Sequence, residues 1–263
     1  MEILVCARRV PDTSENEIEL NSAGNDIERD ELVYSINEPD NYAVEEALQI
    51  AARIGGNVTV VTVGSEDDEE ILRREMAMGA NQGVLITDEA FNGSDARGIA
   101  TILQGFVRKG NYDLILTGVQ AEDGGAQVGG MLAAMLDYPF ASLVNSIEVL
   151  EGRKLKVSRE IEGGNKEMSE IDLPCVLSIQ TGINEPRYVG MRGIRAVASV
   201  PIPTFGASDL GVDPGAVGEA AAKVKRVDYF ILEFGKGAEM LKGSREENVD
   251  KVLELVAAKG GLK

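Results

Sequence analysis

The sequence predicts an α/β fold of three layers: a Rossmann-like, mostly parallel sheet with helices on both faces and an antiparallel extension at one edge. Three observations lead to this prediction. Short β-branched runs alternate with amphipathic, helix-length segments over residues 1–140. Alternating apolar and polar runs then follow one another without helices between them. Beyond about residue 200, Pro and Gly become frequent, which predicts a long C-terminal arm.

The first half of the chain is predicted to alternate strands and helices. Buried strands are indicated by apolar runs that suit a sheet covered on both faces, at 2–10, 57–64, 82–88 and 112–118. Helices are indicated by apolar residues spaced three or four apart, at 41–56, 65–80, 94–110 and 126–137. The first helix places four apolar residues on one side: Ala43, Ala47, Ile50 and Ile54. Repeated units of this kind, with short connections, predict a parallel sheet.

Local signals mark the ends of these helices. Ser65 precedes a run of acidic residues, and a Ser N-cap followed by carboxylates in the first turn favours helix initiation. Gly55-Gly56 and Gly110 are expected to stop two helices, and the last helix ends before Pro139.

The next region is predicted to be an antiparallel meander at the sheet edge. Its four strand-like runs lie at 142–150, 153–161, 166–172 and 174–180, joined by turn-rich "EGR" and "EGGN". The run at 154–161 alternates apolar and polar residues, as a half-buried strand does. Consecutive strands here need not form a separate domain.

The C-terminal region is predicted to be an arm ending in a helix. Residues 201–215 are rich in Pro and Gly and indicate extended chain. Ser244 and Glu247 form a capping-box pattern at the start of a final helix. We therefore expect an α/β domain at 1–198 and an arm with its helix at 199–263, the helix packing either on its own body or on another chain.

Composition excludes several classes of function. The net charge is −18, from 44 acidic and 26 basic residues. This charge argues against a nucleic-acid partner and is equally what a solvated, soluble surface carries. With no His, triads built on imidazole and most transition-metal sites are excluded, so we expect no catalytic residue and no metal. Cys6 and Cys175 lie in apolar strand patterns and are interpreted as small buried hydrophobes.

The distribution of apolar residues indicates a location. No apolar run approaches the roughly 18–20 residues of a membrane span, so we expect no membrane insertion. The N-terminus enters a strand directly, without the pattern of a signal peptide, and we expect a cytoplasmic protein.

A glycine-rich turn is the first candidate binding site. It follows the strand at 112–118, beyond the carboxyl end where ligands gather in open α/β sheets. Gly124-Gly125 would let backbone amides point inward, and the start of the next helix would add its positive end, making an anion cradle. The same residues are also compatible with a plain tight turn in which Asp123 is an N-cap.

A second polar cluster, Ser35 to Asn41, precedes the first helix and would reach the same sheet edge. Pro39 suits the first turn of a helix, so the cluster is an N-cap region in one interpretation. In the other, Asn37 holds the base or ribose of a nucleotide.

The segment at 181–198 carries more large side chains than a turn needs. Pro186 would fix the exit from the preceding strand, and Arg187 and Tyr188 could pin the base. Gly190 and Gly193 would free the backbone beside Met191. The pattern predicts a hinged finger with one apolar tip that contacts another protein; the alternative is that Met191 packs into its own domain.

Several of these segments together resemble the β subunit of electron-transfer flavoproteins. They are "NEPDNYAVEEAL", "TGVQAEDGGAQVGGMLA", "REIEGG" and "LPCVLSIQTGINEPRYVGMRGI", and the resemblance covers most of the chain. It implies a heterodimer with an α subunit that carries the redox-active FAD, and a nucleotide bound by the β subunit. That nucleotide is AMP in ordinary members and a second FAD, reduced by NADH, in electron-bifurcating members.

The resemblance also implies roles for individual residues. The nucleotide would be contacted by Cys6, Asn37, Glu38, Pro39, Asp40, Val63, Gln120, Asp123, Gly124, Gly125, Ala126, Gln127, Val128, Gly129, Gly130, Met131 and Leu132. The docking loop (residues 181–198) would bind an acyl-CoA dehydrogenase-type flavoprotein, with Met191 as its apolar anchor. Contacts to protein partners would be made by Glu162, Pro186, Arg187, Tyr188, Met191, Arg192 and Ile194. The arm and helix at 199–263 would pack on the α subunit.

One alternative belongs to another class of function. A stand-alone adenine-nucleotide sensor could share the same α/β body. The docking loop and the long arm count against a sensor, which needs neither.

Overall fold

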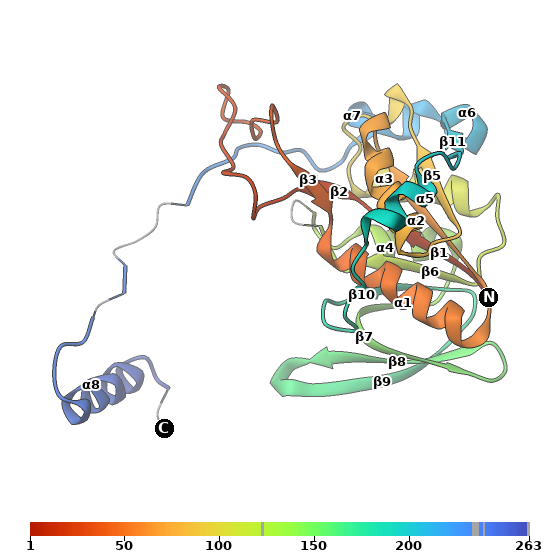
Figure 1. Cartoon of the computed structure of the whole chain (residues 1–263). Helices are drawn as coiled ribbons and strands as arrows, with labels where there is room; N and C mark the ends of the chain where they lie inside the picture. The colour runs from red at the N-terminus through yellow and green to blue at the C-terminus, as the bar shows by residue number, and fades with distance from the viewer. Residues whose placement is uncertain (122–123, 233–236, 239, 262–263) are drawn as a thin grey trace.

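A mostly parallel sheet of nine strands forms the centre of the described part of the chain, in the order β11-β5-β4-β1-β6-β10-β7-β8-β9 (Figure 1). The computed structural model describes residues 1–121, 124–232, 237–238 and 240–261. The sheet strands are β1 (Glu2–Cys6), β4 (Asn57–Val63), β5 (Gln82–Ile86), β6 (Leu114–Gly118), β7 (Phe140–Leu150), β8 (Lys154–Ile161), β9 (Asn165–Asp172), β10 (Cys175–Ile179) and β11 (Thr204–Phe205). A separate antiparallel pair is formed by β2 (Arg9–Pro11) and β3 (Tyr34–Ile36).

Helices cover both faces of this sheet, so the predicted three-layer, Rossmann-like fold is confirmed. The longer ones are α1 (Glu38–Ile54), α2 (Glu69–Met78), α3 (Ala96–Val107), α4 (Val128–Leu136) and α8 (Arg245–Ala258). The shorter ones are α5 (Met191–Val197), α6 (Ala207–Leu210), α7 (Gly218–Ala221) and the 3-10 turns η1 (Glu66–Asp68), η2 (Glu89–Phe91), η3 (Glu162–Gly164) and η4 (Pro214–Ala216). One apolar cluster joins α1 and α2 to the sheet and a second joins α3 and α4 to it.

The central strand β1 shows how the sequence produces two cores. Ile3 and Val5 belong to the cluster under α1 and α2, whereas Leu4 belongs to the cluster under α3 and α4. Successive side chains of a strand point to opposite faces, so a run of apolar residues supplies both. The predicted strand at 2–10 is shorter than expected, because the chain leaves the sheet after Cys6 and forms β2 instead.

The helix caps were predicted with partial success. The Asp68 carboxylate accepts hydrogen bonds from the backbone N (2.6 Å) and the hydroxyl (3.0 Å) of Ser65, so Ser65 starts η1 and α2 begins four residues later. Ser244 and Glu247 form the expected capping box of α8. Of the four apolar residues expected on one side of α1, Ala43, Ala47 and Ile50 are buried. Ile54 is 46% exposed, because the last turn of α1 lies outside the core.

The predicted four-stranded meander is wrong in its last strand. β7, β8 and β9 do pair antiparallel at the sheet edge, but β10 pairs parallel with both β6 and β7. Every residue of β10 is buried. Its apolar run lacks the polar alternation of an edge strand and therefore suits the sheet interior, where both faces are covered.

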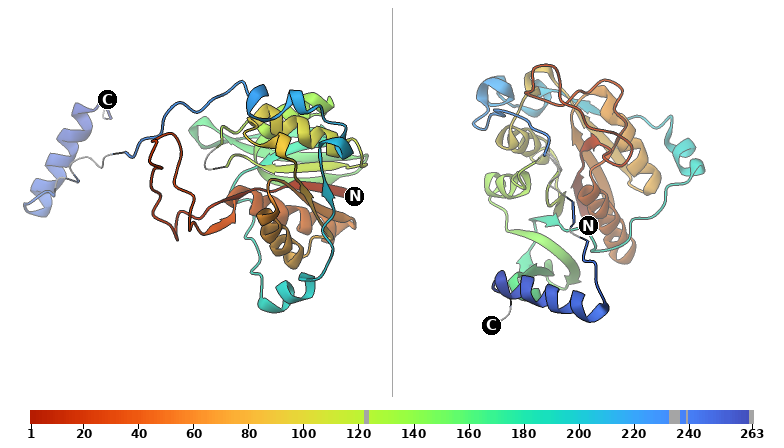
Figure 2. Two further views of the ribbon diagram at one scale, coloured as in Figure 1. Left: turned by 90° about the horizontal axis from the view of Figure 1, so that it is seen from above. Right: turned by 90° about the vertical axis from the view of Figure 1, so that its left-hand side faces the viewer.

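The extended arm begins later than the sequence indicated. Residues 204–221 form β11, α6, η4 and α7, with Ala207, Leu210, Val212 and Val217 buried in the core under α3. These apolar side chains hold the segment on the body despite its Pro and Gly content. Beyond Ala222 the chain leaves the apolar core, and α8 stands apart from the body in both Figure 1 and the left view of Figure 2. In the described part of the chain, no helix is long and apolar enough to cross a bilayer.

Candidate functional site

The carboxyl ends of β1 and β6 meet the start of α1 at one edge of the sheet. Asn37, immediately before α1, donates from Nδ2 to the carbonyl oxygen of Gln120 (3.0 Å) and from its backbone N to that of Arg8 (2.8 Å). The predicted cluster before the first helix and the turn after β6 are therefore neighbours. Cys6 and Val63, which end β1 and β4, lie at the same edge.

Asp40 ties this edge together from the first turn of α1. Its carboxylate accepts hydrogen bonds from the backbone N of Gly118 (2.8 Å) and of Arg8 (2.9 Å). Gly118 has no room for a side chain, because a Cβ would collide with the Asp40 carboxylate. Burial raises the pKa of Asp40 to about 7, against the opposing effect of these hydrogen bonds. Both oxygens of Asp40 are thus engaged by the backbone.

Asn37 carries an unsatisfied polar atom at this edge. Asn37 as a whole is 2% exposed, and its Oδ1 has no hydrogen-bond partner among the described residues. A buried acceptor without a donor costs about 1–3 kcal/mol, so such atoms usually have a partner. The orphaned oxygen marks a place where a ligand could supply that donor.

The described part of the glycine turn is exposed just before α4. Gly124, Gly125, Ala126 and Gln127 are exposed, and the Gln127 side chain does not cap the helix. Ala126 has a φ of +55°, a left-handed conformation that is uncommon for a residue with a side chain. The first backbone amides of a helix have no partner within the helix, so those of α4 are the groups that the predicted anion cradle would use. Asp123 lies outside the described residues.

Gly129 lets α4 begin directly on the sheet. A Cβ there would lie 2.5 Å from the hydroxyl oxygen of Ser178 and 2.8 Å from that of Thr117. These two hydroxyls are buried and hydrogen-bonded to each other at 2.9 Å. Sequence reasoning missed Thr117 and Ser178; hydroxyl residues at the ends of two buried strands were the available signal.

The remaining predicted contacts surround these residues. Pro39, Val128, Gly130 and Met131 are half-buried, Leu132 is buried, and Glu38 is exposed. Cys6 is half-buried, and burial with the nearby Asp40 carboxylate raises the pKa of its thiol, so the thiol stays protonated at neutral pH. Within the described ranges, no group of three or more Cys, Asp or Glu side chains could hold a metal ion.

The docking loop lies on α1 and α2 and exposes an apolar tip. Tyr188 is 93% exposed and Met191 is 63% exposed, with Arg192 and Ile194 also exposed beside them. Met191 is therefore not packed into its own domain. Arg187 and Tyr188 were both predicted to fix the base of the docking loop. Arg187 does so through hydrogen bonds to Glu45, whereas the exposed Tyr188 does not. Pro186, at the start of this part of the loop, is half-buried.

The two glycines beside Met191 were predicted to act as hinges, and this is wrong. Gly190 has an ordinary φ of −81°, and Gly193 lies inside α5. A Cβ on Gly193 would approach the carbonyl oxygen of Ala77 to 3.1 Å, so this glycine lets α5 pack closely on α2. The tip is a short helix rather than a hinged finger.

Glu162 belongs to a different surface. It is exposed at the tip of the β8–β9 hairpin, where Gly163 and Gly164 take φ values of +80° and +71°. In Figure 1 this tip lies on the side of the body that faces α8.

The fold and the site together define a class: a Rossmann-like α/β protein with a polar, glycine-rich edge site and a projecting C-terminal helix. The family model of the electron transfer flavoprotein domain matches residues 25–210. The chain therefore belongs to the electron transfer flavoprotein family.

Known relatives confirm the resemblance to β subunits of this family. The chain is 34% identical to an electron transfer flavoprotein subunit beta of Methylophilus methylotrophus, over 97% of this chain and 98% of that one. It is 36% identical to the subunit beta of Thermoanaerobacterium thermosaccharolyticum, over 97% of each chain. It is also 36% identical to the caffeyl-CoA reductase-Etf complex subunit CarD of Acetobacterium woodii, over 95% of each chain. A role in electron transfer by a flavoprotein follows from this membership.

Proposed function

We propose that this chain is the β subunit of a heterodimeric electron-transfer flavoprotein, that it binds AMP as a structural ligand, and that it docks onto an acyl-CoA dehydrogenase-type flavoprotein. FAD in the α subunit would carry the electrons. The observation that best supports the nucleotide site is the buried Oδ1 of Asn37, which has no hydrogen-bond partner among the described residues, at the edge where the Asn37 side chain meets the turn after β6.

The edge site fits a mononucleotide. Oδ1 of Asn37 could accept a hydrogen bond from an adenine amino group or a ribose hydroxyl. The first amides of α4, which the Gln127 side chain does not cap, suit a phosphate, because a helix N-terminus favours negative charge without a cation. A Cβ on Gly124 or Gly125 would be no closer than 3.5 Å to its neighbours, so these glycines are not needed for internal packing. Their exposure instead suits a ligand that approaches the backbone.

The residues at this edge support a binding role rather than a catalytic one. Cys6 is kept protonated by burial, and both oxygens of Asp40 bind the chain's own backbone. What the chain contributes to electron transfer is then position: a docked loop brings two flavoproteins together, a gating role that needs no acid or base.

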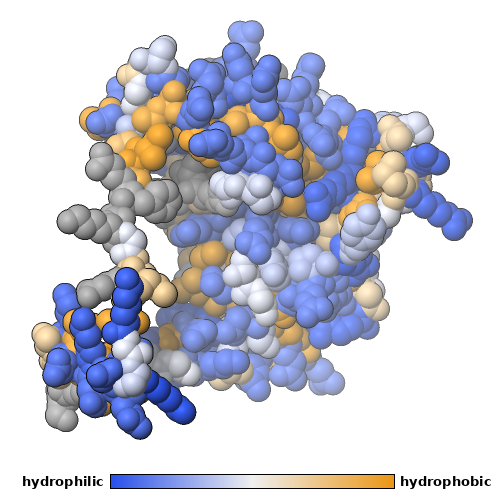
Figure 3. Space-filling view, turned by 60° about the vertical axis from the view of Figure 1, so that its left-hand side comes forward, coloured by the Kyte–Doolittle hydropathy of each residue, from blue (hydrophilic) through white to orange (hydrophobic). Residues whose placement is uncertain are grey.

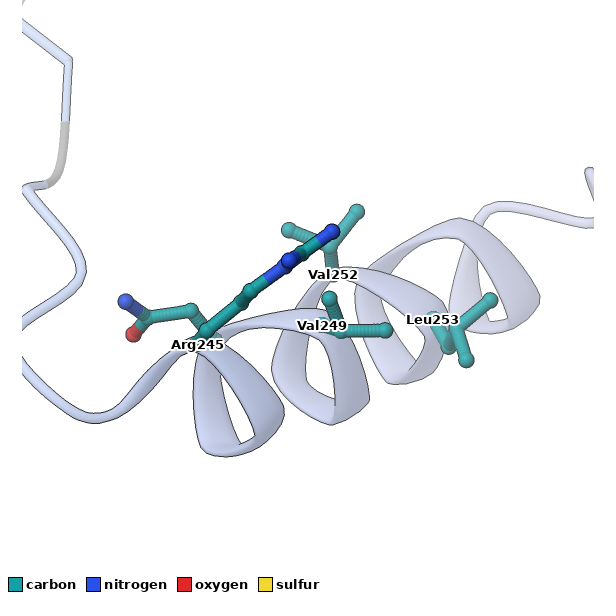
Figure 4. Close-up of a pocket in the computed structure, with 5 residues that line it drawn as sticks. Arg245, Val249, Val252 and Leu253 are labelled. Atoms are coloured by element: carbon teal, nitrogen blue, oxygen red, sulfur yellow. The ribbon is translucent and has the colours of Figure 1, made fainter.

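The exposed apolar side chains of the C-terminal helix favour an interface with another protein. The apolar side chains of α8 that are exposed are Val249, Val252, Leu253, Leu255 and Val256. Figure 4 shows Val249, Val252 and Leu253 projecting from successive turns with no other segment beside them, and Figure 3 shows α8 as a lobe of mixed polar and apolar surface. An exposed apolar face of this kind indicates an interface. We assign it to the α subunit, together with Glu162 at the hairpin tip on the side of the body that faces α8.

Counting the bound nucleotides tests the proposal. The chain is purified with its α partner, the complex is denatured, and the released nucleotides are quantified. One FAD and one AMP per heterodimer is the expected result.

A second candidate function places FAD in this subunit as well. Its support is the relative named as part of a caffeyl-CoA reductase-Etf complex. Two FAD and no AMP would replace the first proposal with this electron-bifurcating one. A stable lone chain that binds ATP and no flavoprotein would instead favour the nucleotide sensor.

The docking role is tested at Met191. A buried hot-spot anchor is worth about 2 kcal/mol, so Met191→Ala should weaken association with the dehydrogenase by about thirtyfold and leave the nucleotide content unchanged. Binding is measured by titration of the complete heterodimer. Ile54→Ala, which removes an equally apolar exposed side chain from the far end of α1, serves as the control. Equal affinity of the Met191→Ala protein and the unmodified protein would rule out Met191 as the anchor.

A further inference from the structure

The base of the docking loop is fixed by a buried carboxylate of α1. Glu45 is 4% exposed at its side chain and accepts two parallel hydrogen bonds from Arg187, at 2.7 Å from Nε and 2.9 Å from an Nη atom. The backbone N of Arg187 donates to the same carboxylate at 3.2 Å. Two parallel bonds fix direction as well as distance, which a single charge contact does not.

Glu46, the next residue of α1, binds the loop at Asn184, three residues before Arg187. Asn184 donates from Nδ2 to the carbonyl oxygen of Tyr42 and to the Glu46 carboxylate, both at 3.1 Å. The adjacent pair Glu45 and Glu46 thus binds two positions of the loop, Arg187 and Asn184.

The far end of the loop is held by an arginine of α2. One Nη atom of Arg73 donates to the carbonyl oxygens of Val197 and Ala198 at 3.0 Å and of Val200 at 3.2 Å. The other Nη atom donates to Glu69 at 3.0 Å, which fixes the guanidinium. Arg73 therefore satisfies carbonyl groups at the end of α5, where no later turn of helix can do so.

These contacts are needed because α5 is too short to be a stable helix without them. It has seven residues, and helices this short are unstable in isolation. No residue of α5 is buried, so its tip contributes little packing. The order of the tip must come from its two ends and from its close approach to α2.

We infer that Glu45 and Arg187 are positioning residues that hold the docking loop in its binding conformation, with Arg73 fixing its far end. The inference rests on the proposed docking function. Burial alone would raise the pKa of Glu45, but hydrogen bonds from Arg187 and Gln49 outweigh it and lower the pKa, so the pair is ionised at neutral pH. Because the loop is already ordered in this way, docking through Met191 does not require a further loss of conformational entropy in the loop.

Hydrogen exchange and kinetics on the complete heterodimer test this role. Loss of charge-assisted hydrogen bonds in Arg187→Gln should speed amide exchange across 184–198 by about tenfold or more. The KM for the dehydrogenase should rise by a similar factor while kcat changes little, because the loop acts in association. Arg187→Lys, which keeps the charge but not the two parallel bonds, should recover only part of the loss.

Two further variants separate the possible outcomes. Glu45→Gln/Arg187→Gln removes both charges and so avoids leaving a buried carboxylate unpaired; it should match Arg187→Gln in both measurements. Arg153→Gln, which breaks a remote ion pair with Asp113, should leave both unchanged. Unchanged exchange in the Arg187→Gln and double variants would overturn the inference. Faster exchange with an unchanged KM would uphold the positioning of the loop and overturn its role in docking.

Discussion

Asp40 acts on the fold through its two carboxylate oxygens, one bound to the end of β6 and the other to the chain just after β1. The two strands are neighbours, and α1 crosses above them with Asp40 in its first turn. Asn37, the residue proposed to contact the nucleotide, immediately precedes this turn. The Asp40 side chain therefore joins β6, the segment after β1 and the start of α1 at this edge.

Glu75 on α2 is a buried carboxyl group of another kind. Its side chain is fully buried, and neither oxygen has a hydrogen-bond partner within the described ranges. Burial raises the pKa of Glu75 to about 8; Arg74 opposes this rise, and the Asp40 and Glu45 carboxylates add to it. The folded chain therefore keeps a proton on Glu75 at pH values where the unfolded chain has released it.

This proton makes stability depend on pH in a defined direction. Because the pKa of Glu75 is higher in the folded chain, its contribution is complete below about pH 4.5 and is lost as the pH rises through about 8. Glu75→Gln should remove a slope of at most about 1.4 kcal/mol per pH unit from the free energy of unfolding. Urea unfolding at several pH values between 5 and 8 measures it. Glu70→Gln, exposed on the same helix, should keep the original slope, and parallel curves for Glu75→Gln and the unmodified chain would contradict the prediction.

At the scale of elements, the start of α4 is placed by a glycine. A Cβ on Gly129 would collide with hydroxyls of both β6 and β10, whereas a Cβ on Gly130 would lie 3.4 Å from the Phe140 ring. Two adjacent glycines of one helix thus differ in what they do. The first allows close packing on the sheet, and the second has space for a methyl group.

This difference gives a matched pair of variants. Gly129→Ala should cost about 1–3 kcal/mol of unfolding free energy, because the added methyl group pushes α4 off the sheet. It should also lower nucleotide occupancy of the purified heterodimer. Gly130→Ala should be neutral or stabilising by up to about 1 kcal/mol, since Ala favours a helix over Gly. Thermal unfolding and nucleotide quantification check both; equal effects of the two substitutions would count against the close-packing role of Gly129.

The sequence predicts where most helices and strands lie, but it does not predict how the strands are ordered in the sheet. Periodicity located α1, α2, α3, α4 and most strands, because each depends on neighbours a few residues away. It could not place β10 between β6 and β7, since strand order depends on contacts distant in sequence. The same limit applies to single side chains: Arg73 binds a carbonyl 124 residues further along the chain, and no local pattern predicts it. The glycine turn and the docking loop were found because their composition is unusual where they stand.

At the scale of the whole molecule, the described chain consists of a body and a helix that the body does not cover. The last buried apolar side chain before the arm is Val217, and the backbone N atoms of Lys223 and Val224 are still tied to Asp95. Further along, Arg226 approaches Asp26 at 4.0 Å in the segment between β2 and β3. Everything that forms the two apolar clusters precedes the arm.

A truncated chain should therefore fold without assembling. A chain that ends at Val224 should keep the thermal midpoint of the isolated full chain within a few degrees, because its core is intact. It should fail to co-purify with the α partner. Full-length Val249→Asp/Val252→Asp should fail in the same way, whereas Asp250→Ala/Glu254→Ala, on the polar part of α8, should assemble. A truncated chain that still forms the heterodimer would show that the arm is not required.

The exposed α8 at the end of the arm affects how the chain fares in the cell before it meets a partner. Released from the ribosome alone, the chain presents exposed valines and leucines on a segment that proteases and chaperones can reach. We expect its cellular half-life to be set by how soon a partner arrives, and its abundance to follow that of the partner. Degradation of copies without a partner would then keep the amounts of the two chains equal. The exposed α8 would be the feature by which such copies are recognised.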